Sequence, residues 1–289
     1  MAELRELQRK LDSIGALQDV VHAMRSLAAV YVRRAEATLE ATRPYGQAVN
    51  TALRLVMEKA GLGIDREGAE RPALGIVFAS DQGLAGSFND RVAEAAQRFP
   101  SEHGAPVRLV CIGHRGGAVL ALRGLEPMLV LNAPTSLEGI KAEMPDLAAR
   151  VFGAFQESGA EEIHFVYNAF ESVGHSAARV RRVLPPVHEA LEPGRAFRYE
   201  PILTAPPLEL LDHLVEEYLF IELYQALLES HASENGARLT AMSAASSNVE
   251  DRLEEIRRQY QSVRQDTITS ELMDVVSGAE ALQDDGGLR

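Results

Sequence analysis

The sequence predicts a fold of mixed class, α/β plus α, in which two long terminal helices form an antiparallel coiled coil around an inserted Rossmann-like α/β domain. Two observations predict it. Apolar residues step by three and four at both ends of the 289-residue chain, as in a coiled-coil seam. Between the ends, short apolar runs alternate with helical patterns, as in a doubly wound sheet. The expected domains are residues 1–60, 73–190 and 208–283.

The N-terminal helix is expected to cover residues 1–60. Pro44 is expected to interrupt or kink it, because proline lacks the N–H group and its ring clashes with the preceding turn. The helix should end near Gly61 and Gly63, and the polar segment 61–72 is typical of a linker. The first half of the seam comprises Leu4, Leu7, Leu11, Ile14, Leu17, Val21, Met24, Ala28, Tyr31, Ala35 and Leu39.

The central segment is expected to hold the sheet, because four short apolar runs there are typical of buried strands. The strands are expected at 73–79, 107–112, 128–131 and 162–167. Amphipathic stretches predict helices around 89–98, 118–122 and 147–156. The run 180–184, stopped by Pro185 and Pro186, should add an edge strand.

The C-terminal segment is free of proline from Leu208 onward and predicts one very long helix. A helix of about 70 residues would be on the order of 100 Å long, so it cannot be buried within its own chain. Small residues at Ala237, Ala241, Ala244 and Ala245 should let another helix approach closely. The predicted seam comprises Met242, Ala245, Val249, Leu253, Ile256, Tyr260, Val263, Thr267, Leu272, Val275, Ala279 and Leu282.

The charge of the chain is concentrated in this helix. Residues 208–289 carry 17 acidic and six basic groups, which gives −11 of the total of −13. This excess disfavours nucleic acid as a partner. No apolar run approaches membrane-spanning length, so we expect no direct membrane insertion. The first ten residues are charged and predict no secretion signal. Cys111, the only cysteine, excludes internal disulfides.

No catalytic, cofactor or metal site is expected from the sequence. The turn 80–89 after the first strand matches neither a dinucleotide-binding glycine motif nor a P-loop, and is expected to be a tight structural turn. The eight histidines are scattered, with no metal-binding spacing. Asp81, His114 and His164 lie near strand ends, where α/β enzymes place catalytic groups, but three such residues are expected by chance.

Several motifs, in order along the chain, carry a family resemblance. The strongest is the C-terminal signature Ile268-Thr269-x-Glu271-x-x-Asp274-x-x-x-Gly278-Ala279-x-Ala281. The others are Ala23-Met24, Arg43-Pro44-Tyr45, Gly83-Leu84-x-Gly86-x-Phe88-Asn89, Phe165-Val-Tyr-Asn168 and Ser233-Glu234 with Ala237-Arg238. Together they resemble the gamma subunit of F-type ATP synthase, the central rotor shaft.

The resemblance implies a rotor function without catalytic residues of the chain's own, so the chain itself would not be an enzyme. The coiled coil would penetrate a sleeve of alpha and beta subunits, and the globular end would meet the epsilon subunit and the ring of c subunits. Proton or sodium flow through the ring would be coupled to ATP synthesis or hydrolysis. The chain would be peripheral, on the cytoplasmic face of the bacterial inner membrane.

The resemblance also implies contact residues. The positions expected to contact loops of the catalytic subunit are Arg264, Gln265, Thr269 and Glu271. Met24 and Arg25 would meet the acidic lever segment of that subunit, and Tyr199 and Glu200 would meet the membrane ring.

The acidic charge and the absence of lysine around Met24 depart from the family's pattern. They lead to the hypothesis of a divergent shaft, including one from a second, specialised ATPase. Two alternatives remain open on the sequence: a non-rotary coiled-coil adaptor with an α/β head, and a nucleotide-dependent enzyme that uses the turn after the first strand.

Overall fold

The structure, a computed structural model, describes residues 2–62, 71–186 and 201–285. It divides into two compact units. The larger comprises Leu27–Ala241, and the smaller combines Met1–Ser26 with Met242–Arg289. Both long helices, α1 (Ala2–Lys59) and α5 (Pro207–Asp285), contribute residues to each unit.

The larger unit contains a five-stranded sheet in the order β3-β2-β1-β4-β5. The first four strands are parallel. The fifth, β5, is an edge strand, as expected, and it pairs antiparallel with β4. The strands are β1 (Ala73–Phe78), β2 (Val107–Ile112), β3 (Leu129–Leu131), β4 (Glu162–Ser172) and β5 (His175–Leu184). The shorter helices are α2 (Phe88–His103), α3 (His114–Leu122) and α4 (Leu137–Ser158). The predicted α/β class is confirmed.

Side chains that alternate along the strands build a separate apolar core on each face of the sheet. On β1, Leu74, Ile76 and Phe78 enter the core shared with α1, α4 and α5. Ala73 and Val77 enter the core shared with α2 and α3. Because both faces of β1 are covered, this strand has no polar side, which is why its sequence is an unbroken apolar run.

The helix α1 continues through Pro44, so this proline does not interrupt it. The other expectation, a kink at Pro44, stays a prediction. Pro44 is exposed on the helix surface. The carbonyl group of Glu40, which loses its N–H partner to the proline, can therefore bond to water.

Helices α2, α3 and α4 and the β4–β5 hairpin are all longer than predicted. The β4–β5 hairpin extends to a tight turn at Val173 and Gly174, where Gly174 has a φ of 79°. The added hairpin residues are mostly polar, so they lack the apolar run on which the prediction relied. Helix α4 begins at Leu137, where the Ser136 hydroxyl caps it by accepting a hydrogen bond of 3.0 Å from the Gly139 N–H. Within the described ranges, no helix has the length and apolarity needed to cross a bilayer.

Candidate functional site

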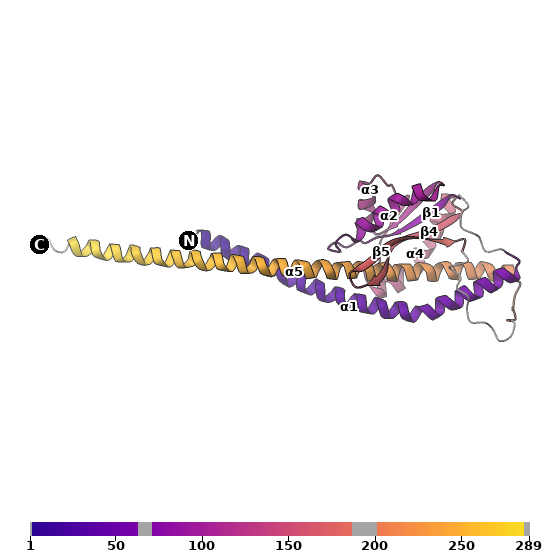
Figure 1. Ribbon diagram of the computed structural model, residues 1–289, viewed down its shortest axis with the longest axis horizontal. Helices are drawn as coiled ribbons and strands as arrows, with labels where there is room; N and C mark the ends of the chain where they lie inside the picture. Colours follow the sequence, from indigo (N-terminus) through magenta and orange to yellow (C-terminus); the bar gives the residue numbers. More distant parts are fainter. Residues whose placement is uncertain (1, 63–70, 187–200, 286–289) are drawn as a thin grey trace. The chain divides into compact units, whose positions relative to one another are not determined.

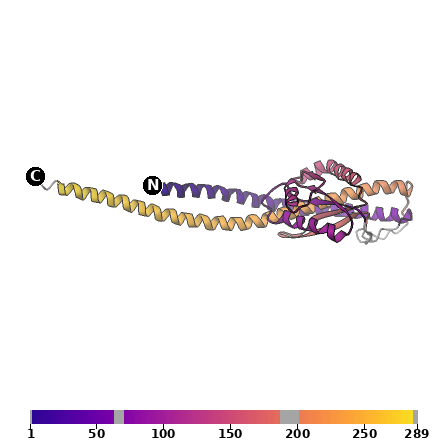
Figure 2. The ribbon, with the colours of Figure 1, turned by 90° about the horizontal axis from the view of Figure 1, so that it is seen from above.

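The smaller unit pairs the N-terminal part of α1 with the C-terminal part of α5. Figures 1 and 2 show the two helices side by side and running in opposite directions. The seam residues Leu7, Val21, Met242, Leu253 and Ile256 are buried. Nε2 of His22 lies 3.0 Å from the hydroxyl oxygen of Ser246 and 3.5 Å from a carboxylate oxygen of Glu250. The predicted antiparallel coiled coil is thus confirmed.

Helix α5 extends past the first residues of α1 in both views (Figures 1 and 2). Large apolar side chains in this stretch are 48% to 69% exposed: Ile268, Leu272, Met273, Val275 and Val276. We call these five residues the α5 apolar face. The sequence predicted Leu272 and Val275 to belong to the coiled-coil seam. That prediction is wrong, because a seam needs a facing helix and α1 does not reach this level.

The predicted contact residues on α5 lie on the surface of the same stretch. Arg264, Gln265, Thr269 and Glu271 are all exposed. The Thr269 hydroxyl donates a hydrogen bond of 2.9 Å to the Gln265 carbonyl oxygen of its own helix. Within the part of the chain that the structure describes, neither Arg264 nor Glu271 makes an ion pair. Their charges are therefore available to a partner protein.

The two predicted contacts on α1 lie at another level of the smaller unit. Met24 is half-buried and Arg25 is exposed. Their neighbour His22 is level with Ser246, and Arg264 follows Ser246 by 18 residues, about 27 Å of helix. The structure therefore does not bring the two groups of contacts together. Tyr199 and Glu200 lie outside the described residues.

Asp81, a residue weighed as catalytic, has a structural role at the carboxyl edge of the sheet. Its carboxylate accepts hydrogen bonds from the backbone N–H of His114, after β2, and of Ala133, after β3, the latter at 2.7 Å. His114 in turn lies 2.8 Å from the Asn132 side-chain oxygen. His164 pairs in register with Gly75 inside the sheet, so the three residues form no common site.

The glycine-containing turn after β1 packs against α5 within the larger unit. A Cβ atom added to Gly86 would lie 3.8 Å from the Ala241 Cβ and 4.0 Å from the Ala237 carbonyl oxygen. The expectation of close packing is confirmed at Ala237 and Ala241. The element that approaches there is this turn, so the expectation of another helix is wrong at these two positions.

Buried polar side chains join α5 to the sheet at the same level. The Ser233 hydroxyl donates a hydrogen bond of 2.7 Å to the Asn168 carbonyl oxygen on β4, and the Asn168 side chain donates one of 3.0 Å to the Phe88 carbonyl oxygen. Both side chains are buried. Because a buried polar group needs a partner, these bonds help to fix how α5 lies on the sheet.

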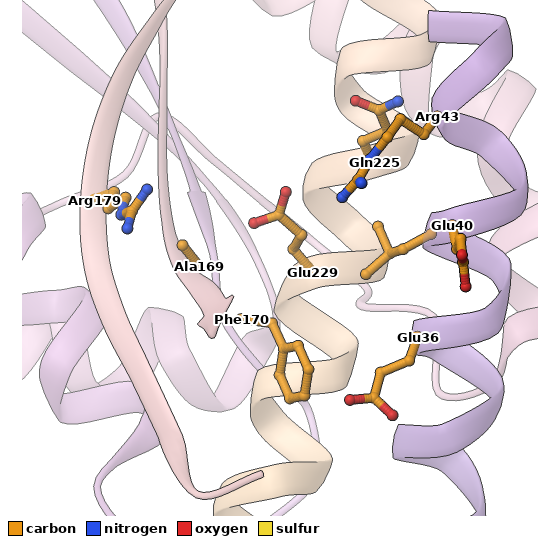
Figure 3. A pocket seen from close by; sticks show the side chains of 9 residues that line it. Glu36, Glu40, Arg43, Ala169, Phe170, Arg179, Gln225 and Glu229 are labelled. Atoms are coloured by element: carbon orange, nitrogen blue, oxygen red, sulfur yellow. The ribbon is translucent and has the colours of Figure 1, made fainter. Parts of the chain in front are cut away.

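A groove of about 500 Å³ opens between α1, α5 and the β4–β5 hairpin of the larger unit (Figure 3). Charged side chains of both signs line it: Glu36, Glu40, Arg43, Arg179 and Glu229. Burial raises the pKa of the Glu229 carboxyl, and this outweighs the attraction of nearby arginines. Charges of both signs at the wall leave the groove without a preference for one class of ligand.

Comparisons with known proteins cover the whole chain. Residues 3–282 match the family model described as ATP synthase. The ATP synthase gamma chain of Solibacter usitatus is 34% identical over 298 residues, with coverage of 98% of this chain and 100% of that one. The chain belongs to the ATP synthase gamma chain family. The gamma chain of Geobacter metallireducens is 32% identical over 292 residues, with the same coverage.

Solved structures share the fold of this gamma-family chain. A chain of the Euglena gracilis mitochondrial ATP synthase, in a structure of OSCP, F1 and c-ring, has a TM-score of 0.67 at 14% identity and covers 97% of this chain. A central-stalk and c-ring structure of the Tetrahymena thermophila enzyme has a TM-score of 0.58 at 22% identity and covers 78% of it. The family that the ordered motifs resemble is confirmed by the family model and by the gamma-chain relatives.

Proposed function

We propose that this chain is the central-stalk subunit of an F-type ATP synthase and couples rotation, driven by ion flow, to ATP synthesis or hydrolysis at partner subunits. The observation that carries the proposal is the 34% identity to a gamma chain over 98% of this chain and 100% of that one. The α5 apolar face supports it, because a long exposed apolar surface marks a site of protein contact.

The chemistry of α5 suits a shaft that turns inside a sleeve. Apolar contacts are non-directional, so the α5 apolar face can slide past an apolar wall without a strong fixed contact. Arg264, Gln265, Thr269 and Glu271 can form directional bonds that differ between rotational positions. We assign these four to loops of the catalytic subunit, and Met24 and Arg25 to its acidic lever segment.

The proposed partners follow from the same assignment. Alpha and beta subunits would form the sleeve, the epsilon subunit would bind the larger unit, and the ring of c subunits would contact Tyr199 and Glu200. The subunit would be peripheral, on the cytoplasmic face of a bacterial inner membrane. The chain itself would supply no catalytic residue, because the nucleotide sites belong to the sleeve.

The acidic surface suggests a shaft matched to its own partners. With 17 acidic and six basic groups in residues 208–289, it would bind an acidic lever segment less strongly than a lysine-rich shaft. This favours a specialised ATPase whose catalytic subunit has lost an acidic residue at that contact.

Purification of the native complex tests the proposal. An affinity tag on this chain should recover nucleotide-binding subunits in a fixed ratio, together with ATPase activity. A fluorescent probe on the larger unit should rotate relative to an immobilised sleeve when ATP is added. A stable homodimer without nucleotide-binding subunits would instead identify the chain as a non-rotary adaptor.

A further inference from the structure

Two histidines and a glutamate meet inside the larger unit. His103 ends α2, and Glu162 and His164 lie on β4. One nitrogen or oxygen atom from each lies within 4.8 Å of the others. The histidine side chains are 10% exposed and that of Glu162 is 2% exposed. The sequence search missed this cluster because it looked for close spacing along the chain, and His103 is distant in sequence from the other two.

The distances are near those that a tetrahedral metal ion requires. The Glu162 Oε2 atom lies 2.7 Å from Nε2 of His164 and 3.9 Å from Nε2 of His103. A zinc ion with bonds of about 2.1 Å would separate neighbouring ligand atoms by roughly 3.4 Å. On zinc binding, the distance from Glu162 Oε2 to His164 Nε2 must therefore widen and the distance to His103 Nε2 must shorten, each by less than about 1 Å.

Surrounding groups contact all three side chains. The second oxygen of Glu162, Oε1, accepts a hydrogen bond of 3.1 Å from Arg182, which orients the carboxylate and leaves Oε2 free to face the imidazoles. The Phe99 ring packs against the His103 and His164 rings, with centroids 5.3 and 4.9 Å away. Partners that orient ligands in this way are typical of protein metal sites.

We propose that His103, Glu162 and His164 bind a zinc ion, with water as the fourth ligand. Two imidazole nitrogens and one carboxylate oxygen are a donor set that zinc favours. The Nε2 atom of His103 donates a hydrogen bond of 2.8 Å to the Arg71 carbonyl oxygen. When the ion binds, this nitrogen gives up that hydrogen bond and bonds to the metal. The ion ties the end of α2 to β4. This site does not depend on the proposed rotor function.

The test uses the full chain, purified without a histidine tag and stripped with a chelator. Cobalt(II), which replaces zinc in tetrahedral sites, should give an intense visible d–d spectrum at one equivalent, and zinc should displace it. Zinc should also raise the unfolding temperature, because an ion that binds only the folded state stabilises it. His103→Gln and His164→Gln should each weaken zinc binding by about 100-fold or more, since loss of a supporting partner alone costs 10- to 100-fold.

His213→Gln is the matched control, because His213 is exposed on α5 and lies outside the cluster. It should leave zinc affinity unchanged. Circular dichroism in chelator should show that all three variants fold. Equal zinc affinity in wild type and in the His103→Gln, His164→Gln double variant would overturn the proposal, as would an octahedral cobalt spectrum. In that case the cluster is only a hydrogen-bonded ion pair around Glu162.

Discussion

Arg238 of α5 donates two hydrogen bonds to the carbonyl oxygen of Gly83, in the turn that follows β1, at 3.3 Å from Nε and 3.2 Å from Nη2. Its Nη1 atom donates a further bond of 3.0 Å to Asn235, and Nη2 also contacts Glu234. The residue is only 4% exposed. One guanidinium group therefore joins α5 to the carboxyl edge of the sheet.

Replacement of this arginine should weaken the larger unit. Arg238→Ala leaves the Gly83 carbonyl and Glu234 without their partner, and we expect a loss of about 3 kcal/mol in the free energy of unfolding. Urea denaturation of the full chain measures it. Arg33→Ala, at an exposed position of α1, is the control and should change stability by less than about 0.5 kcal/mol. Equal effects of both changes would contradict the structural role of Arg238.

Two helical glycines should respond in opposite directions to alanine. A Cβ atom on Gly116 of α3 would lie 2.0 Å from the Ala79 Cβ, so Gly116→Ala should cost about 1–3 kcal/mol through overpacking. A Cβ atom on Gly153 of α4 has no neighbour within 4 Å among the atoms surveyed, so Gly153→Ala should stabilise by about 0.5–1 kcal/mol. Thermal unfolding of both variants measures these two changes in stability. Stabilisation by Gly116→Ala would show that α3 and the end of β1 are not in contact.

His231 should make the larger unit sensitive to acid. The residue is buried, and burial, aided by the charge of Arg238, lowers the pKa of its imidazole to about 4. In the unfolded chain the pKa is about 6.5. Between these values the unfolded chain binds a proton that the folded chain does not, so stability falls as the pH drops through this window, by up to about 3 kcal/mol.

The variant His231→Gln removes the imidazole that binds this proton in the unfolded chain. Its free energy of unfolding should fall less than that of the wild type between pH 7 and pH 4. Denaturant titrations at closely spaced pH values measure the two slopes. His213→Gln, at an exposed position, should retain the wild-type slope. Identical slopes for His231→Gln and wild type would show that the imidazole is accessible to protons in the folded state.

The α5 apolar face should matter for assembly and not for folding. Leu272 and Val275 are 61% and 69% exposed, so Leu272→Asp with Val275→Asp should change the stability of the isolated chain by less than about 0.5 kcal/mol per site. The same change should reduce recovery of nucleotide-binding subunits at least tenfold, because charges would be buried in the sleeve. Ser262→Asp, exposed on the same helix, is the control. Normal assembly of the double variant would exclude this face as the contact.

The charged contacts on α5 should affect coupling more than assembly. Arg264→Ala with Glu271→Ala removes two exposed charges, and each charge-assisted bond is worth about 1.5–3 kcal/mol when formed. We expect at least a tenfold loss of ATP-driven ion transport, with the sleeve still co-purifying. The rate of ATP-driven ion transport into inverted vesicles measures this loss. Arg257→Ala on the same helix is the control. Unchanged transport would remove these residues from the contact.

The core of the sheet could be predicted from the sequence because its chemistry is local. A strand such as β1 that is buried on both faces must be apolar at nearly every position, and a run such as Ala73–Phe78 is therefore distinctive. The α5 motif around Arg238 was recognised as a pattern. Its contact with Gly83 could not be predicted, because the two residues are 155 positions apart.

Periodicity shows that a helix has an apolar face, but not which molecule covers it. Leu272 continued the spacing of Leu253 and Ile256, yet only the last two are buried against the chain's own helix. The cluster around Glu162 was missed for a related reason. Its members meet because the end of α2 and the start of β4 are neighbours in the fold. The spacing of residues along the chain does not show which elements are neighbours.

The two outer strands of the sheet have a consequence for the chain before it meets any partner. One edge strand, β3, has only three residues, and the other, β5, carries Arg179 and Arg181. Short strands and charged side chains both discourage a foreign strand from adding to a sheet edge. A newly made copy can therefore present an apolar helix for docking while its sheet resists the intermolecular strand pairing that begins aggregation.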